Sequence, residues 1–323
     1  MPNLELPETF SQKILPAAAV AEWRATMGPD LAVVVGTFDL LQPGNLALLL
    51  NARRRAQNTF VLLQPDRPGS SRNLTHHSVA ERAEFLAHLR LIDGLSVWPT
   101  PHTADLLQAL RPFSWITATS QVETEPGGNL LLRTAKQVIP EPDLPGCFTG
   151  EIHQALKSGA TPIPLPPFFA NLPPPPSPIP AIPPARRVTV NGCFDILHIG
   201  HLHLLRQAAA MGDELCVLIN SDASVRHYKG PTRPVFHQAC RRAALLAISG
   251  IRDVHIFDTD KPLELIAALQ PALHVKGGSF EPDRVREEEE LVSRWGGKIA
   301  LCPLMEGYSS TAVIQRILKN VTP

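Results

Sequence analysis

Short apolar runs alternate with helix-forming runs along the chain, and this alternation predicts its fold. Residues 31–35 and 187–190 are apolar or β-branched runs of strand length, and each leads through a glycine-containing turn into a leucine-rich helical stretch. A further helix is expected over residues 13–30, ending near a Gly-Pro-Asp sequence. Strands that alternate with helices form parallel βαβ units, so we expect an α/β fold with ligands at the carboxyl ends of the strands.

The same series of segments occurs twice. Residues 36–45 and 192–201 share a glycine, a phenylalanine, an aspartate, a leucine and a second glycine in register. The match continues between residues 61–66 and 217–222, 93–98 and 252–257, and 106–112 and 265–271. This internal repeat predicts two tandem Rossmann-like, parallel-sheet domains with the same order of strands and helices.

A proline-rich segment joins the two copies. Half of residues 161–184 are proline, which excludes a regular helix or central strand and favours an extended, semi-rigid spacer. We therefore expect domains at 1–160 and 185–323, with 161–184 as the linker. Apolar residues within this segment indicate that it lies along a domain surface; they are Ile163, Leu165, Phe168, Phe169 and Ile179.

Composition narrows the functional classes. Lys plus Arg and Asp plus Glu number 30 each, so no basic field argues for nucleic-acid binding. The five cysteines form no Cys-x-x-Cys pair, so neither a zinc site nor a disulfide framework is indicated. No apolar run reaches the roughly 20 residues that a membrane helix needs. We expect a cytoplasmic protein that binds neither nucleic acid nor membranes.

The two copies differ where a phosphate would bind. A helix N-terminus offers free backbone N–H groups to anions, and His198 and His201 are placed to lie on one face of the first turn of such a helix. The first copy has Gln42 and Asn45 instead. Charged residues after other strands of the second copy, among them Lys276, also have no basic counterpart. The first copy is therefore expected to keep the fold and to lack the site.

Residues common to both copies are candidates for a structural role. Asp39 corresponds to Asp195, Asp66 to Asp222 and Arg82 to Arg241, so Arg241 is either an inherited structural contact or a site residue. The acidic run 287–290 is interpreted as a solvated helix face.

Taken together, the segments of the second copy resemble the HxGH-motif nucleotidyltransferase superfamily, of cytidylyltransferase-like fold. Within it they are most similar to the adenylyltransferase domain of bacterial ADP-heptose synthases. The resemblance covers about residues 187–318 and rests on segments 191–201, 220–225, 229–230 with 233–234, 275–278, 296–297 and 306–311. The sequence departs from this family at Ser279-Phe280, which puts the identity of the acceptor in doubt.

The resemblance implies that AMP is transferred from ATP, accompanied by Mg²⁺, to a sugar 1-phosphate such as heptose 1-phosphate, with release of pyrophosphate. It does not identify protein ligands to the metal. The implied catalytic residues are His198, His201, Lys229 and Lys276. The implied nucleotide-binding residues are Gly192, Cys193, Phe194, Asp195, Gly200, Asn220, Asp222, Arg233, Gly277, Ser309, Ser310 and Thr311.

Two alternatives remain open at the level of sequence. One is a cytidylyltransferase acting on glycerol 3-phosphate or phosphoethanolamine, and the other is a nucleotide-binding regulator without turnover. For the first copy we expect a structural role, because domains of this family commonly pair. The two copies would then form a pseudo-dimer within one chain, and a homodimer is also compatible with this expectation.

Overall fold

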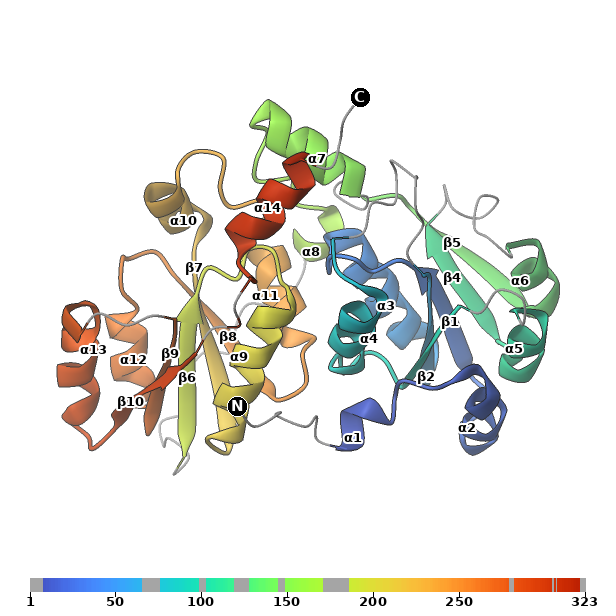
Figure 1. The fold of residues 1–323 in the computed structure, drawn as a ribbon, viewed down its shortest axis with the longest axis horizontal. Helices are drawn as coiled ribbons and strands as arrows, with labels where there is room; N and C mark the ends of the chain where they lie inside the picture. Colours follow the sequence, from blue (N-terminus) through green and yellow to red (C-terminus); the bar gives the residue numbers. More distant parts are fainter. Residues whose placement is uncertain are drawn as a thin grey trace. The chain divides into compact units, whose positions relative to one another are not determined.

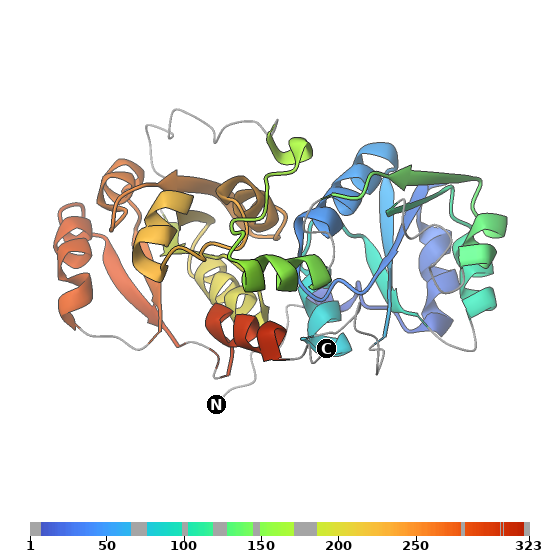
Figure 2. The same cartoon turned by 90° about the horizontal axis from the view of Figure 1, so that it is seen from above.

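The structure is a computed structural model that describes residues 8–65, 76–98, 103–118, 128–144, 149–170, 186–278, 282–303, 305 and 307–319. The chain divides into two compact units, Met1–Glu151 and Ile152–Pro323. Each unit contains one five-stranded sheet whose paired strands are all parallel, with helices on both faces (Figures 1 and 2). The expected pair of tandem Rossmann-like domains is confirmed.

The first unit opens with short helices and then alternates strands with helices. Its strands are β1 (Leu31–Gly36), β2 (Asn58–Leu63), β3 (Gly94–Val97), β4 (Ser114–Ala118) and β5 (Gln137–Glu141). Its helices are α1 (Glu8–Ser11), η1 (Ala17–Ala19), α2 (Val20–Thr26), α3 (Pro43–Arg55), α4 (Val79–Ala87), α5 (Thr103–Leu110) and α6 (Gly128–Thr134), and α7 (Thr149–Ser158) spans the division. The expected helix over 13–30 is shorter than predicted, because the backbone before Ala17 is extended at Pro16.

The second unit repeats this order. Its strands are β6 (Arg187–Gly192), β7 (Glu214–Asn220), β8 (Ile251–Phe257), β9 (Leu273–Gly277) and β10 (Lys298–Cys302). Its helices are α8 (Pro167–Ala170), α9 (Ile199–Ala210), α10 (Asp222–Lys229), α11 (Gln238–Leu246), α12 (Leu263–Leu269), α13 (Pro282–Ser293) and α14 (Ser310–Lys319). The sheet orders, β3-β2-β1-β4-β5 and β8-β7-β6-β9-β10, are the same when the strands are numbered from the start of each unit.

The repeat extends to unusual backbone conformations. Phe38 and Phe194 follow the first strand of their units and both have a left-handed conformation, with φ of 49° and 46°. Their rings fold back over Gly36 and Gly192, where an added Cβ would lie 3.0 Å from the ring in both copies. Each glycine therefore serves to accommodate the phenylalanine ring, which is a structural function common to the two units.

Part of the predicted linker packs on the second unit. The division falls at residues 151 and 152, earlier than the predicted domain boundary at 160. Ile163 and Phe169 are buried, the backbone N–H of Ile163 donates to Val235, and α8 contacts α11. The interpretation that apolar linker residues lie against a domain surface is correct for these two. Ile179 and the adjacent run of prolines lie outside the described residues.

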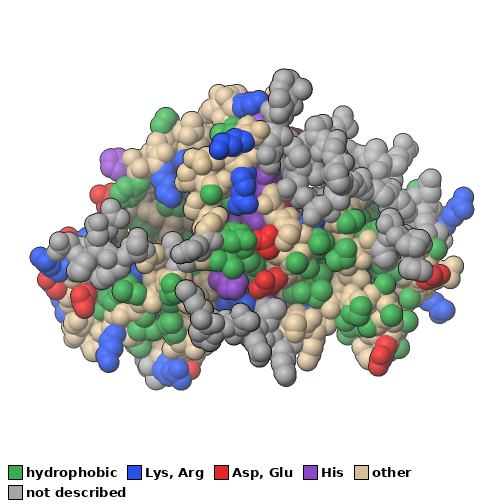
Figure 3. Space-filling model, viewed as in Figure 1, with side chains coloured by type: hydrophobic (Ala, Val, Ile, Leu, Met, Phe, Trp, Pro, Cys, Tyr) green, Lys and Arg blue, Asp and Glu red, His purple; other side chains and the backbone are tan. Residues whose placement is uncertain are grey.

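Charged side chains of both signs are visible on one side of the molecule. On the side of the molecule drawn in Figure 3, basic and acidic side chains are dispersed among uncharged ones, as the balanced composition suggests. In the described part of the chain, none of the helices is both long enough and apolar enough to span a bilayer.

Candidate nucleotide-binding site

The histidine pair begins helix α9, at the carboxyl end of the central strand β6. His198 is the N-cap residue, and its Nδ1 accepts a long hydrogen bond of 3.4 Å from the backbone N–H of His201. The two imidazole rings are stacked with centroids 3.8 Å apart and an interplanar angle of 24°. The predicted placement of both rings on the first turn of a helix is confirmed. Free N–H groups and the positive end of the helix dipole are concentrated at this point.

The two ring nitrogens of His201 have different surroundings. One ring nitrogen is hydrogen-bonded to the Ile196 carbonyl, and the corresponding Asn45 side chain donates to the Leu40 carbonyl over 3.3 Å in the first unit. The other ring nitrogen of His201, Nδ1, is buried and has no hydrogen-bond partner among the described residues. Burial, followed by the neighbouring His198 and Lys229, lowers the pKa of His201 well below its usual value. The ring is therefore neutral near pH 7.

Gly200 provides the space in which the His198 ring sits. A Cβ added to Gly200 would lie 3.1 Å from His198 Nδ1 and 3.0 Å from the Cβ of Tyr308. Both distances are shorter than ordinary van der Waals contact, so a side chain at this position would require the His198 ring or Tyr308 to shift by a few tenths of an ångström. The tertiary structure thus gives this glycine a specific task, and it places Tyr308 beside the motif.

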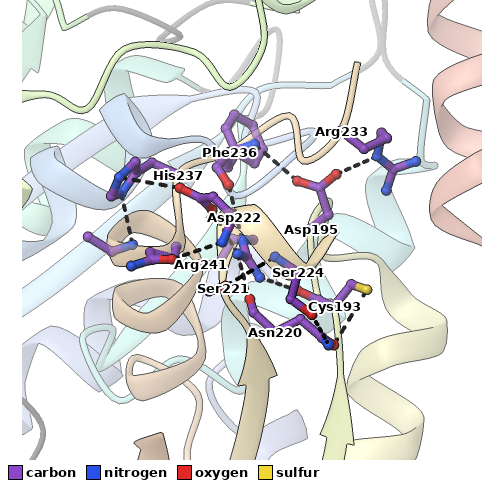
Figure 4. A network of polar contacts seen from close by, with 12 residues as sticks. Cys193, Asp195, Asn220, Ser221, Asp222, Ser224, Arg233, Phe236, His237 and Arg241 are labelled. Carbon is purple, nitrogen blue, oxygen red and sulfur yellow. Dashed lines mark hydrogen bonds and ion pairs between the residues drawn. The ribbon is translucent and has the colours of Figure 1, made fainter. Parts of the chain in front are cut away.

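A buried carboxylate holds the loop after α10 against the turn that precedes α9. Asp195 accepts backbone hydrogen bonds from Val235 and Phe236 at 2.8 to 3.0 Å and pairs with Nε of Arg233 at 2.7 Å (Figure 4). In the first unit, Asp39 accepts equivalent backbone bonds from His76 and His77. Asp195 therefore has a structural function that the first copy retains, and both its oxygens are engaged.

Arg233 is the feature of this loop that points to a ligand. Its side chain is largely buried, and its Nη2 has no hydrogen-bond partner in the described part of the chain. A buried guanidinium donor without an acceptor is costly, because its lost hydration is not replaced. The ion pair with Asp195 aims the guanidinium while leaving this donor available. An anionic ligand would satisfy it.

Arg241 and its counterpart Arg82 make the same structural contacts in the two copies. Its guanidinium donates to the backbone carbonyls of Phe236, Cys193 and Asn220, and Arg82 makes the corresponding bonds to His77, Thr37 and Gln64. These bonds tie together the ends of two neighbouring strands and the loop before a helix. The inherited structural contact that the sequence comparison suggested is therefore present in both copies.

Three other predicted residues line the same strand ends (Figure 4). Asp222 is held by Arg241 at 2.9 Å and by His237 at 3.3 Å. Asn220 donates to Ser224 and lies 3.7 Å from the Cys193 sulfur. They shape the carboxyl edge of β6 and β7, where ligands bind in open α/β sheets.

Lys276 is brought to β9, next to β6, but its charge is already paired. Its Nζ lies 2.6 Å from Glu288 and 2.8 Å from Asn191. Burial is the largest influence on the Lys276 pKa and lowers it, and Glu288 opposes this shift. Interpretation of the acidic run 287–290 as a solvated face is wrong for Glu288, which is buried, and fits its exposed neighbours. The α13 sequence gave no local signal for this pair, although its spacing places Val285, Glu288 and Val292 on one face.

Most of the remaining predicted residues are exposed. Lys229 is exposed at the end of α10, close enough to influence the pKa of His201. Ser309 caps α14 through a 3.0 Å bond from the Ala312 N–H, as its position predicts, while Thr311 and Gly277 are exposed and Ser310 is half-buried. Residues Ser279-Phe280 and Asp66 lie outside the described residues.

Comparison with known proteins finds relatives of the second unit. The model of the cytidylyltransferase-like family matches residues 189–316. Over 131 residues the chain is 47% identical to the bifunctional protein HldE of Koribacter versatilis and to that of Syntrophotalea carbinolica. These matches span 41% of this chain and only 27% and 26% of the two relatives. The segment matched by the family model contains the histidine pair, Arg233 and Lys276. The second unit therefore contains, over residues 189–316, a domain similar to the cytidylyltransferase-like family of nucleotidyltransferases.

Proposed function

We propose that the second unit transfers AMP from ATP to a sugar 1-phosphate and releases pyrophosphate. The proposed sugar phosphate is heptose 1-phosphate. The observation that carries this proposal is the stacked His198 and His201 pair at the start of α9, with a buried, unpartnered Nδ1 on His201. The choice of acceptor rests on the resemblance to ADP-heptose synthase domains and on the HldE relatives.

The chemistry needs positive charge and hydrogen-bond donors. A phosphate oxygen of the sugar phosphate attacks the α-phosphorus of ATP, the bond to the β-phosphate bridging oxygen breaks, and pyrophosphate leaves in line with the nucleophile. Negative charge grows on the α-phosphate oxygens and on the leaving group, so fixed donors in a shielded site lower the barrier. The α9 N-terminus, the two imidazoles, Arg233 and the nearby Lys229 are suited to this task.

The state of His201 is coupled to ligand binding in this scheme. Without ligand the ring is neutral, because burial and neighbouring cations lower its pKa. A bound triphosphate brings negative charge and an acceptor for Nδ1, which raises that pKa and favours a protonated ring that donates to phosphate. ATP binding is then expected to be accompanied by proton uptake.

Mg²⁺ is proposed to enter with the triphosphate rather than to be bound by the apoprotein. Near the histidine pair, the described carboxylates of Asp195 and Asp222 are both engaged with arginines. This donor set fits a cation held chiefly by phosphate oxygens, as is common for Mg²⁺. When bound, the ion would neutralise phosphate charge, while the chain's own residues orient the α-phosphate.

A substrate matrix tests the proposal. ATP and CTP are each combined with heptose 1-phosphate, glycerol 3-phosphate and phosphoethanolamine, and pyrophosphate release is measured. We expect turnover with ATP and the sugar phosphate, and a roughly 100- to 1000-fold lower kcat for His198→Ala. Turnover with CTP alone would refute the adenylyltransferase assignment. No pyrophosphate with any pair would favour a regulator.

For the first unit we propose a structural role as the partner domain of a pseudo-dimer. It keeps the left-handed Phe38, the Asp39 contacts and the Arg82 contacts, but has Gln42 and Asn45 where the histidines stand. A fragment of residues 152–323 that is monomeric, as stable as the whole chain and fully active would contradict this role.

A further inference from the structure

Strands β7 and β8 bring together three side chains that commonly bind metal ions. They are Cys216 on β7 and Asp253 and His255 on β8, and one potential ligand atom from each lies within 4.8 Å of the others. The two strands are neighbours at one edge of the second sheet (Figure 1). The cluster is separate from the nucleotide site, because Asn220 stands four residues beyond Cys216 on β7, about 13 Å along an extended strand.

An irregularity in the strand pairing produces this arrangement. Leu215 pairs with Ile251 but Cys216 pairs with Asp253, so Arg252 is an extra residue on β8. Side chains alternate between the two faces of a strand, and one inserted residue reverses the faces of all that follow. The bulge therefore places Asp253 and His255 on the same face as Cys216. Bulges often direct side chains at functional sites.

The internal repeat supplies a comparison without these ligands. By strand register, Cys216, Asp253 and His255 correspond to Phe60, Gly94 and Ser96. In the first unit Phe60 and Gly94 pair directly, and the Trp23 ring fills the space over the glycine. The same position in the fold is thus an aromatic core in one copy and a set of thiol, carboxylate and imidazole groups in the other.

Burial leaves a polar atom of this cluster without a hydrogen-bond partner. The His255 side chain is buried, with only 7% of the residue exposed, and its Nε2 has no hydrogen-bond partner within the described ranges. Burial also raises the pKa of the Cys216 thiol to about 12 and lowers that of His255. The imidazole is therefore in the neutral form that metals require, whereas the thiol needs a cation to ionise.

The positive charges of the nearby Arg187 and Arg252 are paired mainly with Glu214, which is outside the cluster. Glu214 pairs with Arg187 at 2.6 Å and with Arg252 at 3.3 Å, while Arg252 reaches Asp253 only at 3.7 Å. Arg242 donates to the Val254 carbonyl. Asp253, whose side chain is 18% exposed on this edge strand, is left as the carboxylate that an ion arriving from solvent would meet first.

We propose that Cys216, Asp253 and His255 form a binding site for a divalent cation of the Zn²⁺ type, with one coordination position left to water. A thiolate, an imidazole and a carboxylate are ligands that zinc accepts together, whereas Mg²⁺ and Ca²⁺ prefer oxygen alone. Tetrahedral zinc holds donor atoms about 3.5 Å apart, a separation that lies within the 4.8 Å limit enclosing the three ligand atoms. Binding displaces the Cys216 proton to solvent and forms a metal–sulfur bond, so one proton is released per ion.

Metal titration of the whole chain tests this site. The metal-free protein is titrated with Co²⁺ and followed by absorbance, because a thiolate ligand produces a sulfur-to-cobalt charge-transfer band. Zn²⁺ should abolish this band by displacing Co²⁺, and it should raise the Tm of the second unit. Cys216→Ala and His255→Gln should each lose the band, whereas Cys240→Ala and Cys302→Ala, which alter buried cysteines outside the cluster, should keep it.

The wild-type spectrum alone can refute the proposal, even if a variant fails to fold. Absence of the charge-transfer band in the wild type at saturating Co²⁺ would overturn the proposal. So would a band that persists in Cys216→Ala, since the thiolate would then come from elsewhere, for example from Cys193 near the histidine pair. A band that requires both Cys216 and His255 would establish the site independently of any catalytic activity.

Discussion

The buried pair of Lys276 and Glu288 allows the structural and catalytic contributions of a single lysine to be separated. Lys276→Met keeps an unbranched side chain that is one heavy atom shorter, and removes the charge 2.6 Å from Glu288. Glu288 is only 1% exposed, and its Oε2 already lacks a partner among the described residues. The substitution therefore leaves the Glu288 carboxylate buried, without its present charge partner and without access to water.

The expected loss of stability is large. At 2.6 Å and an effective dielectric constant of about 20, the Coulomb attraction is roughly 6 kcal/mol before desolvation is subtracted. Removal of one member of a buried ion pair typically costs about 3–5 kcal/mol. For a unit of this size each kcal/mol lowers the Tm by roughly 2–4 °C, so Lys276→Met should lower the Tm of the second unit by about 6–20 °C.

Differential scanning calorimetry of the whole chain measures this effect, with the transition of the second unit identified by its shift on addition of ATP. Glu288→Gln in the Lys276→Met background removes the stranded charge and should recover most of the lost Tm. If the double variant is no more stable than Lys276→Met, or if Lys276→Met melts like the wild type, the assigned ion pair is refuted.

Enzyme activity completes the comparison. A lysine that also binds phosphate is still missing in the double variant, so we expect pyrophosphate release to stay low although stability returns. Recovery of full activity together with stability would show that Lys276 acts only as the partner of Glu288.

Three further predictions concern packing and protonation. Gly200→Ala should lower kcat by about 100-fold, as measured by pyrophosphate release, because its Cβ would crowd His198; an unchanged kcat would contradict the assigned role of this glycine. Phe169→Ala should cost about 3–5 kcal/mol in urea unfolding and the more exposed Phe168→Ala distinctly less, whereas equal small effects would show that α8 does not stabilise the second unit. Burial lowers the pKa of His274 to about 3 from an unfolded value of 6.5, so its neutral form contributes full stability above pH 6.5 and loses it as the pH falls towards 3. The free energy of unfolding should be about 2 kcal/mol lower at pH 5 than at pH 7 from this residue, and His274→Asn should reduce that slope; identical slopes would refute it.

Features that depend on neighbours in the chain were predictable. The alternation of strands and helices and the histidine pair at a helix start follow from spacing within a few residues, because hydrophobic periodicity and turn geometry are local properties. The internal repeat follows from comparing distant segments of the same sequence. Comparison of the two copies also separated Phe194 and Arg241, which have counterparts, from His198 and His201, which do not.

Which distant groups meet was decided only by the tertiary structure. Lys276 and Glu288 are twelve residues apart, and Arg233 meets Asp195 across thirty-eight. The bulge at Arg252 that places Asp253 and His255 beside Cys216 arises from the pairing of two strands. The amino-acid sequence alone determined the secondary structure, the duplication and the residue types available for chemistry. Strand register and helix packing then determined which charges are already paired and which donors remain for a ligand, because these depend on contacts between segments that local patterns do not encode.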